Sequence, residues 1–274
     1  MKAFPIGSVE LAFKRSRIKM PSLGGRSLFL VQLVNKVVGS CRVNFDAEYP
    51  YERLGPSELD KLCSIEAEFS ETYQTGRPHD NTYLDLLGNH LATSHRFGLN
   101  LVLGNPKYVC TPRLGALEKK AALICMRYGC GGSRLKLGAE GIRYGEEIIR
   151  ICSKLDASAY ILYTPNMFKL LEASKKLSVN TAVYTPIRMA QNEARALSET
   201  VDLGGDYLMR RGIGKESAAL RASDYILFGS PGDVVGKMRE WLMLGVNKIV
   251  LSPLFSSHSD LCQQLHYIAK CISD

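Results

Sequence analysis

The chain has 274 residues, a length that suits one large domain or two small ones. Hydrophobic residues make up 46% of it, which excludes wholesale disorder. The formal net charge of +8 permits attraction to anions such as phosphorylated cofactors, acidic protein partners or nucleic acids. The densest basic cluster lacks the interleaved aromatic residues of a single-strand binder, so we expect no dedicated nucleic-acid site. This cluster comprises Lys14, Arg15, Arg17 and Lys19.

None of the eight cysteines forms a C-x-x-C pair, and their spacing does not match a zinc ribbon. We therefore expect reduced cysteines in apolar surroundings, as in a cytoplasmic protein, and no metal site. The nearest pair, Cys125 and Cys130, flanks a turn, where a redox role is the less favoured alternative. No signal peptide is visible, and no apolar run reaches the roughly 18 residues needed to span a membrane. The sequence thus predicts a soluble protein without a membrane partner.

The first half of the chain contains fewer clearly predicted helices and strands than the second half. The segment 27–38 fits either a helix or a strand, and both alternatives stay open. The other strands are predicted at 9–14, 42–47 and 69–75, and the helices at 56–67 and 81–96.

In the second half, short apolar runs alternate with amphipathic segments. Three of the runs are predicted to stop at a dipeptide that ends in proline: Thr164-Pro165, Thr185-Pro186 and Ser252-Pro253. The strands are predicted at 99–104, 134–137, 159–163, 181–184 and 248–251. The helices are predicted at 114–127, 144–155, 167–176, 191–200 and 233–244.

This alternation predicts parallel strand pairing, because each crossover helix must cover a face of the sheet. Counting both halves gives roughly eight strands, as a closed TIM-type (β/α)8 barrel requires. No linker rich in Pro, Gly or Ser divides the chain, so we predict a single α/β domain over 1–274. The long connection 190–230, with Gly204-Gly205, is predicted to be an insertion between the seventh and eighth strands that forms a lid or a contact surface.

The segment 225–253 carries a recognisable pattern, YILFGSPGDVVGKMREWLMLGVNKIVLSP. Ser230 or Pro231 is predicted to open a helix, Asp233 to favour its positive end, and Gly245 to stop it. This pattern resembles the C-terminal signature of the bacterial-luciferase-like monooxygenases, which runs Gly-Thr-Pro-Glu-Asp-Val, helix, Ala-Gly-Val, strand. Upstream, 182–197 is similar to the strand and Glu-Ala-Arg helix that precede the long insertion in members of this superfamily.

The resemblance implies a (β/α) barrel that transfers a hydride between deazaflavin F420 or the flavin FMN and a small oxidised substrate. The archaeal-type F420-dependent methylene-tetrahydromethanopterin reductases share the barrel and a similar signature. Homodimers are common in the family, so the resemblance makes a homodimer the candidate assembly.

Active sites of such barrels lie at the carboxyl ends of the strands. A flavin-like ring needs apolar walls, and its phosphate needs cations or amide groups. The residues predicted to bind the cofactor are Lys14, Asn105, Tyr163, Tyr184 and Arg188. Core packing of each tyrosine and a solvated surface position for each cation remain the alternatives.

Two residues are predicted to transfer protons. Glu140 lies between two glycines at a strand end, where its carboxylate would serve as a general acid or base or would cap the helix near Ile142. His79 lies between Pro78 and Asp80. It would form a proton-transfer pair with Asp80, or it is an exposed loop histidine.

Two other functions stay open. One is a cofactor-free barrel that works as a binding or assembly subunit for an acidic protein partner. The other is a barrel enzyme for a phosphorylated metabolite, with anion contacts from Arg188 and Ser256-Ser257. A barrel fold alone does not choose among these functions.

Overall fold

Parallel pairing between neighbouring strands organises the chain. A computed structural model describes residues 4, 8–14, 26–39, 41–46, 54–64, 67–72, 85–86, 89–90, 93, 97–104, 118–119, 122–123, 125–126, 135–140, 142–155, 158–163, 165 and 181–273. The strands are β1 (Val9–Lys14), β2 (Arg42–Asp46), β3 (Ala67–Thr72), β4 (Phe97–Gly104), β5 (Leu135–Glu140), β6 (Ser158–Tyr163), β7 (Thr181–Met189), β8 (Leu227–Gly229) and β9 (Lys248–Pro253). The helices are α1 (Arg26–Val37), α2 (Pro56–Cys63), α5 (Ile142–Leu155), α7 (Glu193–Arg210), α8 (Lys215–Arg221), the short η3 (Ala222–Asp224), α9 (Pro231–Met243) and α10 (His258–Ser273).

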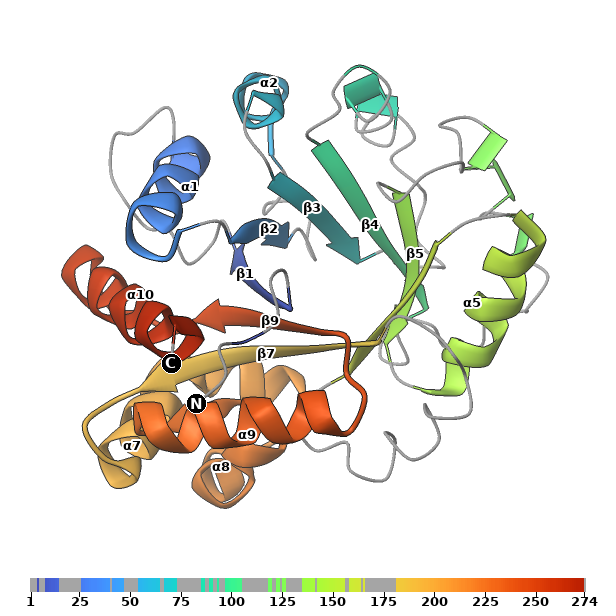
Figure 1. Cartoon of the computed structure of the whole chain (residues 1–274). Coiled ribbons are helices and arrows are strands. Elements are labelled where there is room, and N and C mark those ends of the chain that lie inside the picture. The colour runs from blue at the N-terminus through green and yellow to red at the C-terminus, as the bar shows by residue number, and fades with distance from the viewer. Residues whose placement is uncertain are drawn as a thin grey trace.

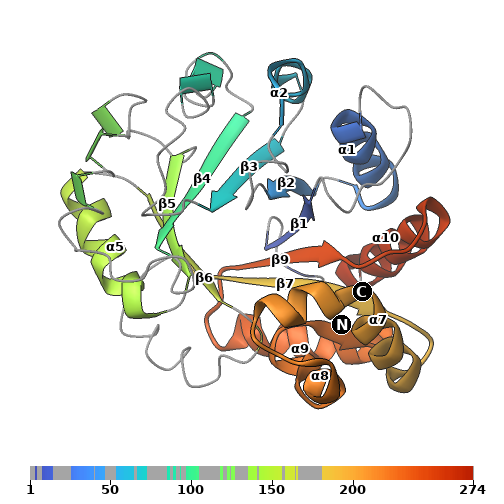
Figure 2. The same ribbon diagram turned by 180° about the vertical axis from the view of Figure 1, so that it is seen from behind.

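Each strand from β1 to β5 pairs in parallel with the next strand along the chain. β6 then pairs with β7, β7 with β9, and β9 with β1, so the pairings return to the first strand (Figures 1 and 2). β8 joins this sheet beside the carboxyl end of β7, where Leu227 lies opposite Ile187. The predicted α/β class with a parallel sheet is confirmed.

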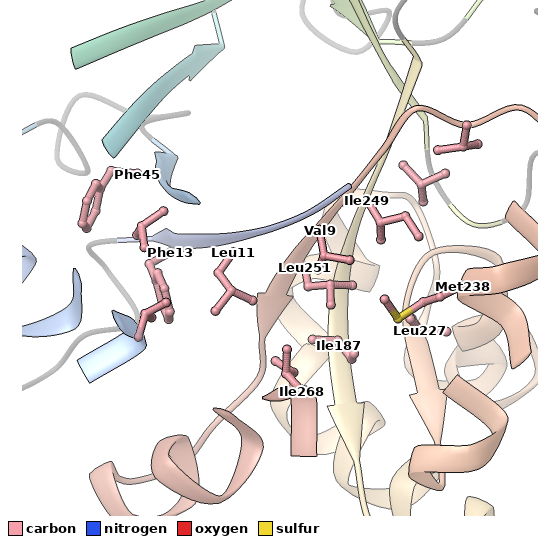
Figure 3. Close-up of a cluster of buried hydrophobic side chains, with 14 of the residues drawn as sticks. Val9, Leu11, Phe13, Phe45, Ile187, Leu227, Met238, Ile249, Leu251 and Ile268 are labelled. Atoms are coloured by element: carbon pink, nitrogen blue, oxygen red, sulfur yellow. The ribbon is translucent and has the colours of Figure 1, made fainter. Parts of the chain in front are cut away.

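Alternate residues of the strands face the surrounding helices. In β1 these are Val9, Leu11 and Phe13, which share one buried cluster with Met238 of α9 and Ile268 of α10 (Figure 3). Fully burying a side chain of this size contributes roughly 1.5–3 kcal/mol. Because strand side chains alternate, the residues between them face the opposite, inner side of the strands.

Most predicted elements lie near their expected bounds. The open segment 27–38 is the helix α1, whose Leu30, Val31 and Val34 are buried at helical spacing. The predicted helix 167–176 lies outside the described residues.

β7 does not stop at Thr185-Pro186, as was predicted, but continues to Met189. The Ile187 carbonyl accepts from the Leu254 amide on the β9 side, and the Ala190 amide donates to Gly229 on the β8 side. The backbone groups of successive residues in a strand point alternately to its two neighbours, so the backbone of Pro186 faces the β8 side. On that side the β6 pairing ends at Val183 and the β8 pairing starts at Ile187. The N–H that proline lacks therefore falls where none of the described strands pairs with β7, so the strand tolerates it. β9 likewise runs through Ser252 to Pro253.

The segment 190–230 contains α7, α8, η3 and β8 and has a hydrophobic cluster of its own. α7 extends beyond the helix predicted at 191–200 and includes the glycine pair Gly204-Gly205. A Cβ atom on Gly204 would lie 2.7 Å from Ile226 Cδ1 and 3.4 Å from Leu254 Cδ1. Gly204 is therefore explained by the close approach of α7 to these side chains.

The predicted start and end of α9 are confirmed. Ser230 is the N-cap, Pro231 follows it, and the Ser230 hydroxyl accepts from the Asp233 amide while the Asp233 carboxylate accepts from the Ser230 amide. The Ser230 hydroxyl and amide both donate to the Asp233 carboxylate, and these hydrogen bonds hold the pKa of Asp233 below its ordinary value. Gly245 follows the helix with φ +96°, a conformation that favours glycine.

The cysteine prediction holds only in part. Cys41, Cys152, Cys262 and Cys271 are free, but Cys125 is disulfide-bonded, contrary to the prediction of reduced cysteines. Burial raises the pKa of the Cys152 thiol to about 12, as expected of a thiol in apolar surroundings. Within the described ranges, no helix is both long enough and apolar enough to cross a membrane.

Candidate functional site

Three of the predicted site residues lie on the neighbouring strands β5, β6 and β7, two of them at a carboxyl end and Tyr184 within β7. Glu140 is the last residue of β5 and lies opposite Leu162 of β6. Tyr163 is the last residue of β6 and lies opposite Val183 of β7, next to Tyr184. Lys14 ends β1 opposite Asp46, farther round the sheet. His79 and Asn105 lie outside the described residues, and their roles stay predictions.

Tyr184 lies on the inner face of the strands. Its side chain is half-buried and packs against Ala12 of β1, Ala182 of β7 and Val250 of β9. This group is separate from the cluster that faces α9 and α10. Small apolar side chains beside a partly exposed aromatic ring form the kind of wall that a flat heterocycle requires.

A polar column that sequence reasoning missed occupies the same inner face. Asn100 Nδ2 donates to Asn44 Oδ1 at 3.3 Å, and Asn44 Nδ2 donates to Glu10 Oε2 at 2.8 Å. Glu10 also pairs with Lys248, and Arg42 Nη1 lies 4.0 Å from its carboxylate. Glu10, Asn44 and Asn100 are all buried.

The signal for this column was a polar residue between apolar strand neighbours, as in Val43-Asn44-Phe45 and Val9-Glu10-Leu11. Glu10 and Lys248 are among the first two residues of their strands, at the amino side of the sheet. In barrels that side serves stability and not chemistry, so we interpret the column as a structural support for the inner wall.

Arg188, predicted to bind a phosphate, is buried at the carboxyl end of β7. Its Nε donates to Glu199 Oε2 of α7 at 2.7 Å, and its Nη1 donates to Asp260 Oδ1 of α10 at 2.7 Å. Nη1 also donates to the Leu254 carbonyl at 2.9 Å. The guanidinium is thus paired with two carboxylates and one carbonyl, and it ties β7 to α7, to α10 and to the loop after β9.

Glu199 balances more than one positive charge. It accepts from Arg195 Nε at 2.8 Å as well as from Arg188. Partial burial raises the pKa of Glu199, but the hydrogen bonds from Arg195 and Arg188 outweigh it and hold the pKa below its ordinary value. The carboxylate is therefore ionised at neutral pH.

Gln264 of α10 continues the pairing of β7 where β9 ends. Its Oε1 accepts from the Met189 amide and its Nε2 donates to the Met189 carbonyl, both at 2.9 Å. The side chain is buried, so both backbone groups at the end of β7 are satisfied away from water. α10 is thereby fixed to this strand end at two points, Arg188 and Met189.

No model of a protein family and no curated protein sequence matches the chain. Solved structures do match it over nearly its whole length. An F420-dependent secondary alcohol dehydrogenase in complex with an F420–acetone adduct superposes with a TM-score of 0.65 at 9% identity, covering 100% of both chains. The FMN-bound oxygenating constituent of 3,6-diketocamphane monooxygenase from Pseudomonas putida gives 0.62 at 11% identity, covering 97% of this chain and 98% of that one.

An EDTA monooxygenase from Chelativorans sp. BNC1 gives a TM-score of 0.57 at 11% identity, covering 96% of this chain and 93% of that one. At such low identity these matches show the fold alone. The predicted resemblance to the bacterial-luciferase-like superfamily is confirmed at the level of the fold.

Proposed function

We propose that the protein is an oxidoreductase that binds F420 or FMN at the carboxyl ends of its strands and acts on a small oxidised substrate. The observation that carries this proposal is the half-buried Tyr184 on a wall of Ala12, Ala182 and Val250. The proposal is supported by full-length similarity in fold to structures whose names include FMN and F420.

The proposal includes the architecture predicted from sequence. In this proposal the parallel strands form a closed (β/α)8 barrel, and the segment 190–230 is the insertion before its last strand. In this arrangement Tyr184 lines the barrel interior below the ends of β5 and β6, and the mouth above it receives the ligand.

The inner wall fits the flat ring of a flavin or deazaflavin, because it combines small apolar side chains with one aromatic face. When bound, such a cofactor would supply the hydride chemistry. We assign Tyr184 and Tyr163 to the ring, and Lys14 and Asn105 to the phosphate-bearing tail. Arg188 is left out of this set because Glu199, Asp260 and Leu254 already occupy its donors.

Two residues complete the proposed site by handling protons. Glu140 ends the strand next to β6, and we assign it the exchange of a proton with a substrate bound above the ring. His79 is the second candidate for this role. Neither assignment requires a metal ion.

The proposal is tested by titrating the protein with F420 and FMN and comparing Tyr184→Ala with Tyr267→Ala. Tyr267 is a partly buried tyrosine that packs against the outer cluster on α10, so it controls for loss of an aromatic side chain elsewhere. We expect Tyr184→Ala to weaken cofactor binding by about 10-fold, because an aromatic contact contributes roughly 0.5–1.5 kcal/mol beyond its buried area. Tyr267→Ala should bind as the unaltered chain does.

Equal affinities of the two variants would contradict the placement of the ring against Tyr184. Circular dichroism of both variants, recorded before the titration, ensures that only folded protein is compared.

A further inference from the structure

The carboxylate of Asp260 lies in a seat built from anion-binding groups. Its Oδ1 accepts from Arg188 Nη1 at 2.7 Å, and its Oδ2 accepts from the Ser256 amide at 2.9 Å and the Ser256 hydroxyl at 3.0 Å. Asp260 is in the first turn of α10, so its charge also meets the positive end of that helix. Its own amide donates to Ser257 Oγ at 3.2 Å.

The Arg188 donor of this seat is held in place by other residues of the fold. Arg188 is 7% exposed and is fixed from its other side by Glu199 and by the Leu254 carbonyl. The Ser256 amide lies in the loop between β9 and α10, and Gln264 ties α10 to the end of β7. The guanidinium is therefore held by partners other than Asp260.

A guanidinium, a backbone amide, a hydroxyl and a helix N-terminus are the groups that bind phosphate in proteins. In (β/α) barrels they are frequently found after the last two strands of the barrel, with the N-terminus of a nearby helix. The Asp260 seat lies at this corner, after β7 and β9. The chain places its own carboxylate where such barrels bind the phosphate of a ligand.

We propose that Asp260 is a built-in anion that excludes phosphate monoesters from the corner between β7, β9 and α10, and that removing its side chain creates a phosphate-binding site there. The inference concerns a different part of the strand ends from the Tyr184 wall and does not depend on the proposed cofactor. If correct, Asp260 sets which ligands this mouth accepts, and a phosphorylated ligand must place its phosphate elsewhere.

The charges support this view. In the folded protein the guanidiniums of Arg188 and Arg195 are balanced by the carboxylates of Glu199 and Asp260. Loss of the Asp260 carboxylate leaves one positive charge in excess and leaves the Ser256 donors without this acceptor. An anion of matching size would restore both.

The test compares thermal unfolding in potassium phosphate and potassium chloride at constant ionic strength. Asp260→Ala empties the seat, whereas Asp260→Asn removes the charge but keeps the seat filled. Asp224→Ala makes the same change in net charge at an exposed ion pair with Arg221. We expect phosphate to raise the melting temperature of Asp260→Ala alone, saturably, by a few degrees at about ten times the dissociation constant.

No phosphate response in Asp260→Ala would overturn the proposal. An equal response in Asp260→Asn, in Asp224→Ala or in the unaltered chain would overturn it too, because the effect would not then depend on an empty seat. If Asp260→Ala is unfolded in chloride, the readout is recovery of its unfolding transition on adding phosphate, and lack of recovery at about 100 mM contradicts the inference.

Discussion

At the scale of the residue, Arg188 shows how much of a side chain's role depends on partners distant in sequence. A cation just after a strand of a predicted barrel suggested a phosphate ligand. Its partners Glu199 and Asp260 are 11 and 72 residues away along the chain, so their convergence on Arg188 could not be predicted from the sequence. A buried cation that is surrounded by carboxylates fixes structure first, since leaving either charge unpaired away from water is costly.

Arg188→Met should therefore lower the free energy of unfolding by about 3–5 kcal/mol, because it leaves two carboxylates without their buried partner. Urea unfolding at neutral pH measures this loss. Arg195→Met removes an exposed arginine from the same network and should cost no more than about 1 kcal/mol. If Arg188→Met lowers the free energy of unfolding by less than about 1 kcal/mol, the ion pairs of Arg188 do not stabilise the fold.

The same network predicts a dependence of stability on pH. The pKa of Glu199 is lower in the folded protein than its ordinary value of 4.5, so the unfolded chain binds a proton more readily. The stability that Glu199 contributes is fully present above pH 4.5 and is lost as the pH falls through the lower, folded-state pKa. Unfolding of Glu199→Gln should vary less with pH in this acidic range than that of the unaltered chain. Parallel curves for the two proteins would contradict the assignment.

At the scale of the element, the ends of strands and helices depended on neighbours that the sequence does not reveal. β7 runs through Pro186 because none of the described strands pairs on that side of it at that position. α7 runs through Gly204-Gly205 because Gly204 is needed where Ile226 and Leu254 approach the helix. The signature around α9 was predicted correctly, since a capping box and a terminal glycine act within one turn of the chain.

The glycine pair gives a matched test of this explanation. Gly205→Ala meets no atom within 4 Å and should stabilise the protein by about 0.5–1 kcal/mol, because alanine is the better helix former. Gly204→Val should destabilise it by roughly 1–3 kcal/mol, because the side chain would overlap Ile226 Cδ1. Thermal unfolding of both variants checks the two signs. Equal effects of the same sign would show that packing against α7 does not explain Gly204.

At the scale of the whole molecule, the alternation of apolar strands and amphipathic helices was sufficient to predict a parallel α/β fold. The inner face was not predicted, because Glu10, Asn44 and Asn100 lie on three different strands that only pairing brings together. Of the predicted site residues, Glu140, Tyr163 and Tyr184 lie on adjacent strands, which the order of strands already implied. The pairing of Arg188 with its distant carboxylates was not predicted.

The central claim is that this fold binds a flavin or a deazaflavin at the carboxyl ends of its strands. The most direct test is a fluorescence titration of the unaltered protein with F420 and with FMN, in oxidised and reduced forms. Our account predicts saturable binding of one of them, accompanied by a raised melting temperature, since a ligand that binds only the folded state stabilises it. No binding of either at about tens of micromolar, in protein shown to be folded, would contradict the account and favour a barrel that works without this cofactor.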